Sequence, residues 1–380
     1  MYFVEERGKR NIFKNFDIIT FLPVVFLAIF GLIVVKSATM TRTSGGTKMI
    51  IVQSLTFILG CIIAIVISFF DYRSINVLIS LAYIGSCFLL VLVLLIGRGE
   101  QIGSRSWIKI AGITIQPAEF AKVTFVLTVS KYLVKLKETS DIKDLLKLCV
   151  SAMIPLSLVV IQKDFGTACV FVAIFFVLLF VYGLSMKYIA AIGGSFLALM
   201  PVMWFFVLNE KRKDRIRVFL NPELDPLGSG MNVLRSKMTI GSGRIFGKGL
   251  FKGIQTQNSA VPVKESDFIF SVIGEETGLV FSVLVVLVFL FILLRCIYIA
   301  KNSEDIYGKF IVMGFVAMIG AHFIENIGMS IGILPVTGIP LPFISQGGTS
   351  MLANFAAIGF VLSVSKLRKK RNKKKTYNIL

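Results

Sequence analysis

Long apolar runs, separated by short polar stretches, follow one another along almost the whole chain of 380 residues. About 20 consecutive apolar residues are enough for a helix to cross a bilayer. The runs predict membrane-spanning helices at 17–38, 48–69, 76–97, 117–136, 144–162, 166–184, 187–209, 267–298, 307–331 and 350–366. The pattern therefore predicts an all-α integral membrane protein, a polytopic bundle of about ten transmembrane helices that forms a single domain over 1–380.

The composition supports this fold class. Hydrophobic residues make up 56% of the chain, charged residues only 16%, and the mean hydropathy is +0.83. A soluble domain is roughly 45–50% apolar and about 25% charged, so a soluble enzyme, a disordered chain and a disulfide-rich secreted module are excluded. The five cysteines lie in apolar stretches without a C-x-x-C pair, and the single His322 excludes a histidine-rich metal site.

The charge indicates how the chain is oriented. The net charge is +20, from 41 Lys and Arg residues against 21 Asp and Glu residues. Lys and Arg gather in the cytoplasmic loops of membrane proteins and near anionic lipids. The basic tail 367–380 is the strongest such marker, and it predicts that both termini are cytoplasmic. We attribute the positive charge to topology and membrane lipids and expect no nucleic acid as a partner.

Three connections are unusual, and all fall outside the cell in this topology: 98–116, 210–266 and 332–349. The second is a large extracytoplasmic loop between spans seven and eight. The third reads GILPVTGIPLPFISQGGT, in which proline and glycine prevent a regular helix. It is also too apolar for a solvated loop. Irregular backbone at membrane depth is tolerated only where it is buried in protein or lines a cavity.

Ionisable residues inside membrane spans are costly and are candidates for function. Glu119 and Lys122 follow Pro117 at the start of the fourth span, three residues apart, so they share a helix face. A functional pair and a structural ion pair are equally compatible with this spacing. Asp164 lies between two spans, where it could also be a helix cap.

A second group of carboxylates surrounds the start of the eighth span. Asp267 begins this span, where the long basic loop meets the membrane, although an aspartate there could also be a cap. Glu275 and Glu276 lie two turns further on. For these two glutamates we favour pairing with basic residues from other spans over a catalytic role.

The loop 210–266 combines basic side chains with glycines, which suits a phosphate group. Its segment GSGRIFGKG is not a Walker A motif, because five residues separate Gly241 from Gly247 and no Ser or Thr follows Lys248. Any phosphate bound here therefore belongs to a substrate or a lipid. The alternative is a solvated basic loop that touches lipid headgroups.

A series of motifs resembles one family across nearly the whole chain. That family is SEDS (shape, elongation, division and sporulation), which includes RodA and FtsW. The matching stretches are GLIVVKSAT at 31–39, FFDYR at 69–73, GSRSWIKIAGITIQPAEFAK at 103–122, QKDFGTA at 162–168, RIRVFLNPELDP at 215–226, IGSGRIFGKGLFKGIQTQ at 240–257, SDFIFSVIGEETG at 266–278 and ENIGMSIGILPVTGIPLPFISQGGTS at 325–350.

The resemblance implies a function and a set of site residues. Its members are peptidoglycan glycosyltransferases of the bacterial plasma membrane that polymerise lipid II. The essential aspartate of the family's DFIF motif corresponds to Asp267. The Glu and Lys of its QPSE-x-x-K motif correspond to Glu119 and Lys122, the loop arginine before Trp to Arg105, and the Asp of its QPDLGT motif to Asp164.

The implied mechanism assigns chemistry to these residues. Asp267 is expected to act as the general base for the GlcNAc 4-hydroxyl of one lipid-linked sugar. Arg105, Lys122 and basic loop residues such as Lys248 are expected to offset the charge of the departing diphosphate. The resemblance also suggests a divalent cation, Mg²⁺ or Mn²⁺, although the sequence has no self-evident metal cage. No nucleotide is required, and a class B penicillin-binding protein is the expected partner.

The chain departs from the family at four positions. Lys163 replaces a proline, Val263 replaces a glutamate, Gln346 replaces a tyrosine, and Lys36 stands where the family has a tyrosine. GLFKGIQTQ and the short termini resemble the RodA elongation branch more than the division branch. Two other functions stay open. One is a flippase for the lipid-linked precursor, and the other is a non-catalytic scaffold of the cell-wall machinery.

Overall fold

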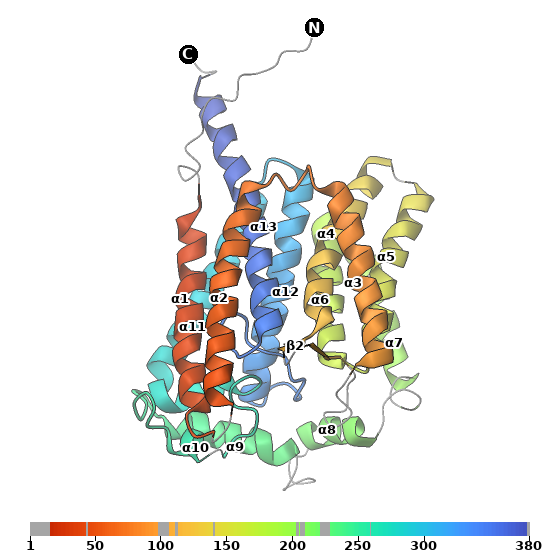
Figure 1. Cartoon of the computed structure of the whole chain (residues 1–380). Helices are drawn as coiled ribbons and strands as arrows, with labels where there is room; N and C mark the ends of the chain where they lie inside the picture. Colours follow the sequence, from red (N-terminus) through yellow and green to blue (C-terminus); the bar gives the residue numbers. More distant parts are fainter. Residues whose placement is uncertain are drawn as a thin grey trace.

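The fold is a bundle of long helices with a cap of shorter helices at one end (Figure 1). The computed structural model describes residues 16–42, 45–97, 106–110, 113–139, 141–202, 205, 210–220, 229–258 and 260–377. The bundle helices are α1 Ile18–Thr39, α2 Gly46–Phe69, α3 Asn76–Ile96, α4 Pro117–Thr139, α5 Ile142–Ile161, α6 Phe165–Tyr182, α7 Met186–Val202, α11 Ile269–Lys301, α12 Ile306–Ser330 and α13 Gly348–Tyr377.

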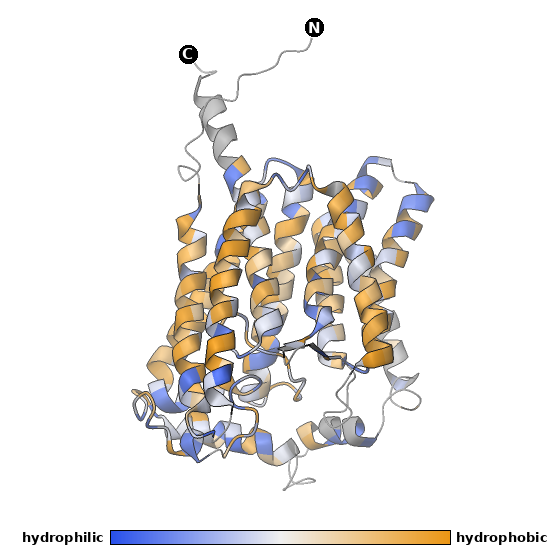
Figure 2. Cartoon of the chain, in the orientation of Figure 1, coloured by the Kyte–Doolittle hydropathy of each residue, from blue (hydrophilic) through white to orange (hydrophobic). Residues whose placement is uncertain are grey.

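Each predicted span coincides with one of these helices, within a few residues at most ends. Eight helices of the described chain are long and apolar enough to cross a membrane. The other two are α4, which carries several Lys and Glu residues, and α7, of which 17 residues are helical. Figure 2 shows apolar residues covering the sides of the bundle, with polar residues gathered at its two ends. The all-α polytopic architecture is therefore confirmed.

Aspartates define where three of the helices begin. Asp141 accepts a hydrogen bond from Lys143 N at the start of α5, and Asp305 accepts one from Gly308 N at the start of α12. Asp164 accepts one from Thr167 N at the start of α6. An aspartate at this position satisfies an amide that the first helical turn leaves unpaired.

The interior of the bundle is built on α12 and α13. In α13, 78% of the most apolar window is buried, against 17% in the peripheral helix α2. Small residues allow the close contact between α2 and α13. A Cβ on Gly60 would lie 2.7 Å from the Phe355 ring, and one on Gly359 would lie 3.0 Å from Ala64. Small residues at helix contacts let backbones approach, which is the main route to tight packing in a bilayer.

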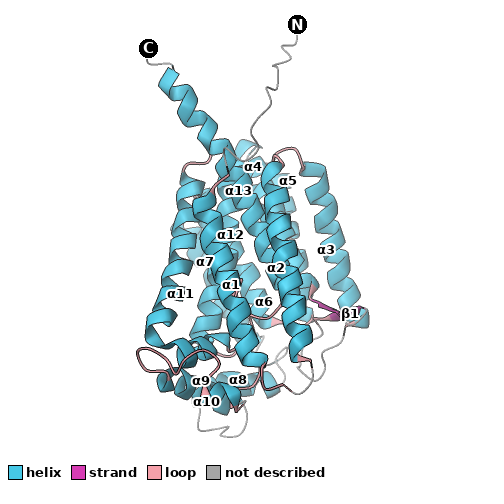
Figure 3. Ribbon diagram, turned by 60° about the vertical axis from the view of Figure 1, so that its left-hand side comes forward, coloured by secondary structure: helices cyan, strands magenta, loops and turns pink. Residues whose placement is uncertain are grey.

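The connection between α7 and α11 forms the cap. It contains α8 Glu210–Leu220, α9 Ser229–Ser242 and α10 Ile254–Gln257. These helices lie across the end of the bundle opposite to the one at which α1 begins and α13 ends (Figures 1 and 3). A short antiparallel hairpin, β1 Ile108–Ile110 and β2 Ile113–Ile115, precedes α4. The basic tail continues α13 as a helix to Tyr377.

The apolar connection between α12 and α13 is irregular, as its prolines and glycines predict. It folds back against the bundle and is buried over most of 339–345, whereas Ile333 and Gly338 stay exposed. Leu341, Phe343 and Ile344 are buried, and a Cβ on Gly31 of α1 would lie 2.6 Å from the Ile344 backbone. The second half of the segment 332–347 is therefore part of the protein interior at the capped end.

Candidate functional site

Asp267 lies in a tight turn directly before α11. Its side chain is half-buried, and its Oδ1 accepts a hydrogen bond of 2.8 Å from the Ser266 hydroxyl. Its main-chain carbonyl accepts a bond of 2.9 Å from the Asn326 amide on α12. A Cβ on Gly338 would lie 3.3 Å from Asp267 Oδ2, so the segment 332–347 passes next to this carboxylate.

Hydrogen bonds join the segment 332–347 to the turn that carries Asp267. Ser345 donates to the Ser266 carbonyl at 2.6 Å, and Gln346 N donates to the Glu265 carbonyl at 2.9 Å. Asn326 donates its second bond to the Ile339 carbonyl at 2.8 Å. On the other side, Gln53 of α2 bonds the Ser345 carbonyl at 2.9 Å. The irregular segment thus forms one wall of the Asp267 site.

The turn itself is conformationally unusual. Val263 has φ +52°, a left-handed conformation that β-branched residues rarely adopt. Its carbonyl accepts bonds from the amides of Ser266 and Asp267, at 3.2 and 3.1 Å. The next side chain, Lys264, is buried and donates to the Thr256 carbonyl, and burial lowers the pKa of its ammonium. The position at which the family has a glutamate therefore initiates the turn that presents Asp267.

Glu119 and Lys122 form an ion pair of 2.8 Å between two fully buried side chains of α4. The Lys122 ammonium also contacts His322 Nε2 of α12 at 2.6 Å. The shared helix face predicted from the sequence is confirmed. The contact with His322 could not be predicted, because 200 residues separate it from Lys122.

Asp164 caps α6, which agrees with the simpler of the two sequence interpretations. Its second oxygen accepts a bond of 3.1 Å from the Gln116 amide at the start of α4. A Cβ on Gly166 would lie 3.0 Å from Thr337, so the segment 332–347 also reaches this cap. Lys163, in place of the family's proline, has φ +62°, which a proline ring does not permit.

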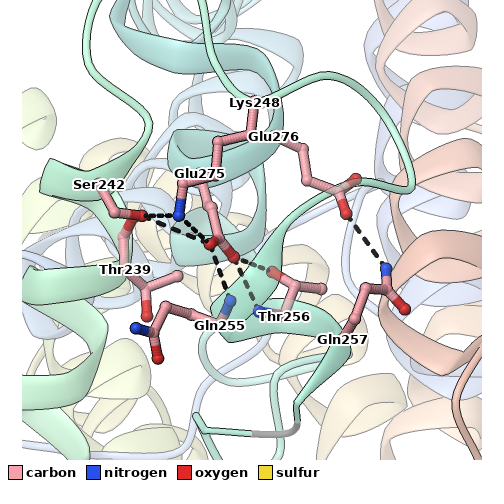
Figure 4. Close-up of polar contacts among 8 residues, drawn as sticks. All are labelled: Thr239, Ser242, Lys248, Gln255, Thr256, Gln257, Glu275 and Glu276. Carbon is pink, nitrogen blue, oxygen red and sulfur yellow. Dashed lines mark hydrogen bonds and ion pairs between the residues drawn. The ribbon is translucent and has the colours of Figure 1, made fainter.

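Lys248 lies away from these groups, in a buried network that Figure 4 shows. Its ammonium pairs with Glu275 Oε1 at 2.7 Å and donates to Ser242 at 2.8 Å. The Glu275 carboxylate also accepts bonds from the Gln255 amide and from Thr256. We expected Glu275 to pair with a basic residue of another span, but its partner is Lys248 of the loop.

Glu276 anchors the same loop to the first helix. Its Oε1 accepts a bond of 2.6 Å from Ser37 of α1 and one of 3.4 Å from Gln257. Its Oε2 accepts a bond of 3.1 Å from the Phe251 amide. Among the described residues, hydroxyl and amide donors bind this carboxylate, and no ion pair with a basic residue of another span is present. The two glutamates thus fasten 242–257 to the bundle.

The sequence analysis missed two residues that hold the backbone of the site, because it considered only ionisable groups within the spans. Asn326 and Gln53 are uncharged, fully buried and bonded to the backbone around Asp267. A polar amide within an apolar span is itself a signal, because an unpaired amide in the bilayer is costly. Arg105 lies outside the described residues, so its predicted position is not observed.

The described residues contain no group of three or more His, Cys, Asp or Glu side chains able to hold a metal ion. Mg²⁺ usually binds through one or two carboxylates together with substrate phosphates. Among the described residues at this site, the Asp267 carboxylate could hold such a cation together with a phosphate group bound beside it.

Comparisons with known proteins identify the family. The family profile described as "Cell cycle protein", of FtsW, RodA and SpoVE, matches residues 18–370. The probable peptidoglycan glycosyltransferase FtsW of Trichlorobacter lovleyi is 32% identical over 358 residues, which cover 92% of this chain and 93% of the relative. The peptidoglycan glycosyltransferase MrdB of Escherichia coli is 33% identical over 271 residues, which cover 71% and 73%.

A solved structure agrees with this assignment. Its title is "Structural coordination of polymerization and crosslinking by a peptidoglycan synthase complex", and it matches with a TM-score of 0.79 at 27% identity, over 94% of this chain and 99% of that one. Relatives named FtsW, MrdB and RodA all match this chain, so the elongation branch stays a prediction. The chain is a multi-pass membrane protein that belongs to the cell cycle protein family of FtsW, RodA and SpoVE.

Proposed function

We propose that this protein is a peptidoglycan glycosyltransferase that polymerises lipid II into glycan strands. The observation that carries the proposal is the position of Asp267. Its half-buried carboxylate stands between α12 and the irregular segment 332–347, and hydrogen bonds from both sides to the main chain of 265–267 fix the turn that carries it. A catalytic base needs this kind of fixed position.

In the proposed reaction, Asp267 takes the proton of the GlcNAc 4-hydroxyl of one lipid-linked sugar. The oxygen forms a bond to the anomeric carbon of the second lipid-linked sugar, and the bond from that carbon to its lipid diphosphate breaks. Direct displacement inverts the configuration at this carbon. Lys122 and Arg105 would stabilise the negative charge that develops on the diphosphate. Asp164, Glu119 and Lys248 remain proposed substrate-binding residues.

The surroundings suit a substrate with a long hydrocarbon chain. An open groove of about 580 Å³ lies beside the first turns of α4 and is lined mostly by apolar side chains, among them Phe88, Leu89, Phe120 and Val123. Phe120 and Val123 alternate with Glu119 and Lys122 along α4. The same helix therefore separates an apolar groove from a buried charged pair, as an amphipathic lipid diphosphate requires.

We further propose that the enzyme works with a class B penicillin-binding protein and serves cell elongation. A solved structure that matches this chain is described as a peptidoglycan synthase complex. The GLFKGIQTQ motif supports the elongation branch. Both termini would lie in the cytoplasm and the cap 210–266 on the outer face of the membrane. A divalent cation would bind together with the diphosphate of the substrate.

The test is polymerisation of lipid II by the purified protein in detergent, with and without its cognate transpeptidase. Wild type and Asp267→Asn would be assayed together. We expect glycan strands from wild type and none from a folded Asn variant. Equal product from both would remove Asp267 from the role of base. The absence of product from either, with the partner present, would favour the flippase or the scaffold.

A further inference from the structure

His322 is the single histidine of the chain and lies fully buried between α12 and α4. Its Nε2 contacts the Lys122 ammonium at 2.6 Å, and the same ammonium pairs with Glu119 at 2.8 Å. Glu119 belongs to the same helix as Lys122, one turn earlier. His322 therefore supplies the contact that fixes Lys122 to a second helix.

The chemistry of the pair determines which nitrogen of His322 carries the proton. A charged lysine donates hydrogen bonds and accepts none, so Nε2 must be the acceptor. A neutral imidazole then has its hydrogen on Nδ1. Among the described residues, His322 Nδ1 has no hydrogen-bond partner, and Glu119 Oε2 has none either. A buried N–H without an acceptor is costly, so an oxygen atom is expected next to Nδ1.

The face of α12 that carries His322 also carries Asn326, which contacts Asp267. Asn326 follows His322 by four residues, so the two side chains project from one face of the helix. Asn326 bonds the main chain of Asp267, whereas His322 bonds Lys122. This helix face thus connects the proposed base to the cation that would stabilise the leaving group.

We infer that His322 is a positioning residue for Lys122. It holds the ammonium from α12 as a neutral Nδ1–H imidazole, and its Nδ1–H binds an oxygen atom supplied either by a buried water or by the lipid diphosphate. A lysine side chain has many rotamers, and a second hydrogen bond from another helix restricts them. The role in catalysis rests on the proposed function, but the contact and the tautomer do not.

Nuclear magnetic resonance tests the contact independently of activity. A protein labelled with ¹⁵N-histidine and purified with a histidine-free tag has one imidazole, so its two ring nitrogens are assigned without ambiguity. We expect the neutral Nδ1–H form, and we expect Lys122→Met to move the Nε2 resonance. The matched variant Tyr307→Phe, which changes α12 nearer its other end, should leave it in place. A neutral Nε2–H form or an imidazolium would overturn the inference.

Titration with lipid II distinguishes the two sources of the oxygen. A shift of the Nδ1 resonance that saturates with lipid II identifies the lipid diphosphate as the acceptor. An Nδ1 resonance that is unchanged by lipid II and shows exchange with water identifies a buried water. An Nδ1–H that contacts neither of them would contradict the oxygen site.

Polymerisation kinetics test the positioning role. His322→Gln keeps an oxygen that can accept from Lys122, whereas His322→Leu does not. We expect His322→Leu to lower kcat on the order of 100-fold, the loss caused by a misplacement of about 1 Å, with little change in KM. His322→Gln should recover most of this activity. In a Lys122→Met background, His322→Leu should add no further loss.

Two kinetic results would overturn the positioning role. One is a similar activity of folded His322→Leu and wild type. The other is an equal loss in the Gln and Leu variants together with a normal Tyr307→Phe control. If wild type itself makes no glycan, the proposed function fails, while the resonance experiment still decides the contact and the tautomer.

Discussion

Individual glycines at the capped end explain a motif whose composition suggested phosphate binding. Gly247 has φ +80° and Gly278 has φ +73°, and the two backbones touch. A Cβ on Gly247 would overlap the carbonyl of Glu276. Glycine is needed where the backbone is left-handed and no space for a side chain exists. In GSGRIFGKG, therefore, Gly247 serves close packing.

Replacing Gly247 by alanine should destabilise the protein strongly. The left-handed conformation costs about 1–2 kcal/mol for a residue with a Cβ, and the overlap with backbone adds about 1–3 kcal/mol. Gly249→Ala is the matched control, because Gly249 has φ +97° but its Cβ would meet only the flexible Lys252 side chain, at 3.4 Å. Denaturant unfolding in mixed micelles measures both variants. Equal losses would show that the overlap is relieved without cost.

Helix α11 is interrupted at Gly278, and the loop residues 244–249 form hydrogen bonds with its backbone on both sides of the interruption. At Gly278 the backbone leaves the helical conformation. Lys248 N and Gly249 N donate to the carbonyls of Glu275 and Glu276, before the break. After the break, the Leu279 and Val280 amides donate to the carbonyls of residues 244 and 245. The loop thus satisfies backbone groups that the break leaves without a partner within the helix.

Neutralising Glu275 should loosen this loop. In Glu275→Gln the ion pair with Lys248 is lost, and an amide donor faces other donors. We expect a loss of roughly 2–3 kcal/mol, less than for a fully buried pair because the Lys248 side chain is 25% exposed. Hydrogen exchange of the amides in 248–257 measures the change. Glu304→Gln is the control. Glu304 and Arg73 form an ion pair in which both side chains are 40% exposed, and such a pair contributes about 0–1 kcal/mol to stability. Unchanged exchange in 248–257 would contradict the structural role of Glu275.

The Ser345 hydroxyl links the irregular segment 332–347 to the turn that carries Asp267. Ser345 accepts a bond of 2.9 Å from the Leu341 amide and donates one of 2.6 Å to the Ser266 carbonyl. We expect Ser345→Ala to lower kcat for polymerisation by roughly 10-fold, because the wall beside Asp267 would shift by a fraction of an ångström. Ser157→Ala, whose exposed hydroxyl bonds only within its own helix, should have wild-type activity. An unaltered kcat in the Ser345 variant would show that the wall is held without it.

At the scale of the molecule, the two ends of the bundle differ. The cap lies at one end, whereas α1 begins and α13 ends at the other (Figure 1). At this second end, Asp17 joins three helices. It lies directly before α1 and accepts hydrogen bonds from Arg295 of α11 and from Ser365 of α13. The charge pattern predicts that this second end faces the cytoplasm.

Cysteine labelling in intact cells tests the predicted orientation. The natural cysteines are replaced, and a single cysteine is introduced at Phe246, which is 82% exposed in the cap, or at Asn302, in the connection between α11 and α12. We expect a membrane-impermeant maleimide to label the Phe246→Cys variant directly and the Asn302→Cys variant only after permeabilisation. The reverse pattern would invert the topology.

The membrane class, the positions of the spans and the irregular nature of 332–347 could all be predicted from the amino-acid sequence. These follow from apolar length, charge and the restrictions of proline and glycine, which are local properties. The Glu119–Lys122 pair and the Asp164 cap could also be predicted from the sequence, because each contact joins residues three positions apart.

Contacts between residues far apart in the chain became known only from the folded structure. Lys122 pairs with His322, Lys248 with Glu275, and Asn326 holds Asp267. Each contact joins residues tens or hundreds of positions apart, and the spacing of polar residues in one helix does not identify the face of another that it meets. The break in α11 also could not be predicted. A glycine at 278 permits a helix to end, but the free backbone groups on both sides of the break find partners only because a loop about 30 residues earlier in the chain packs against them.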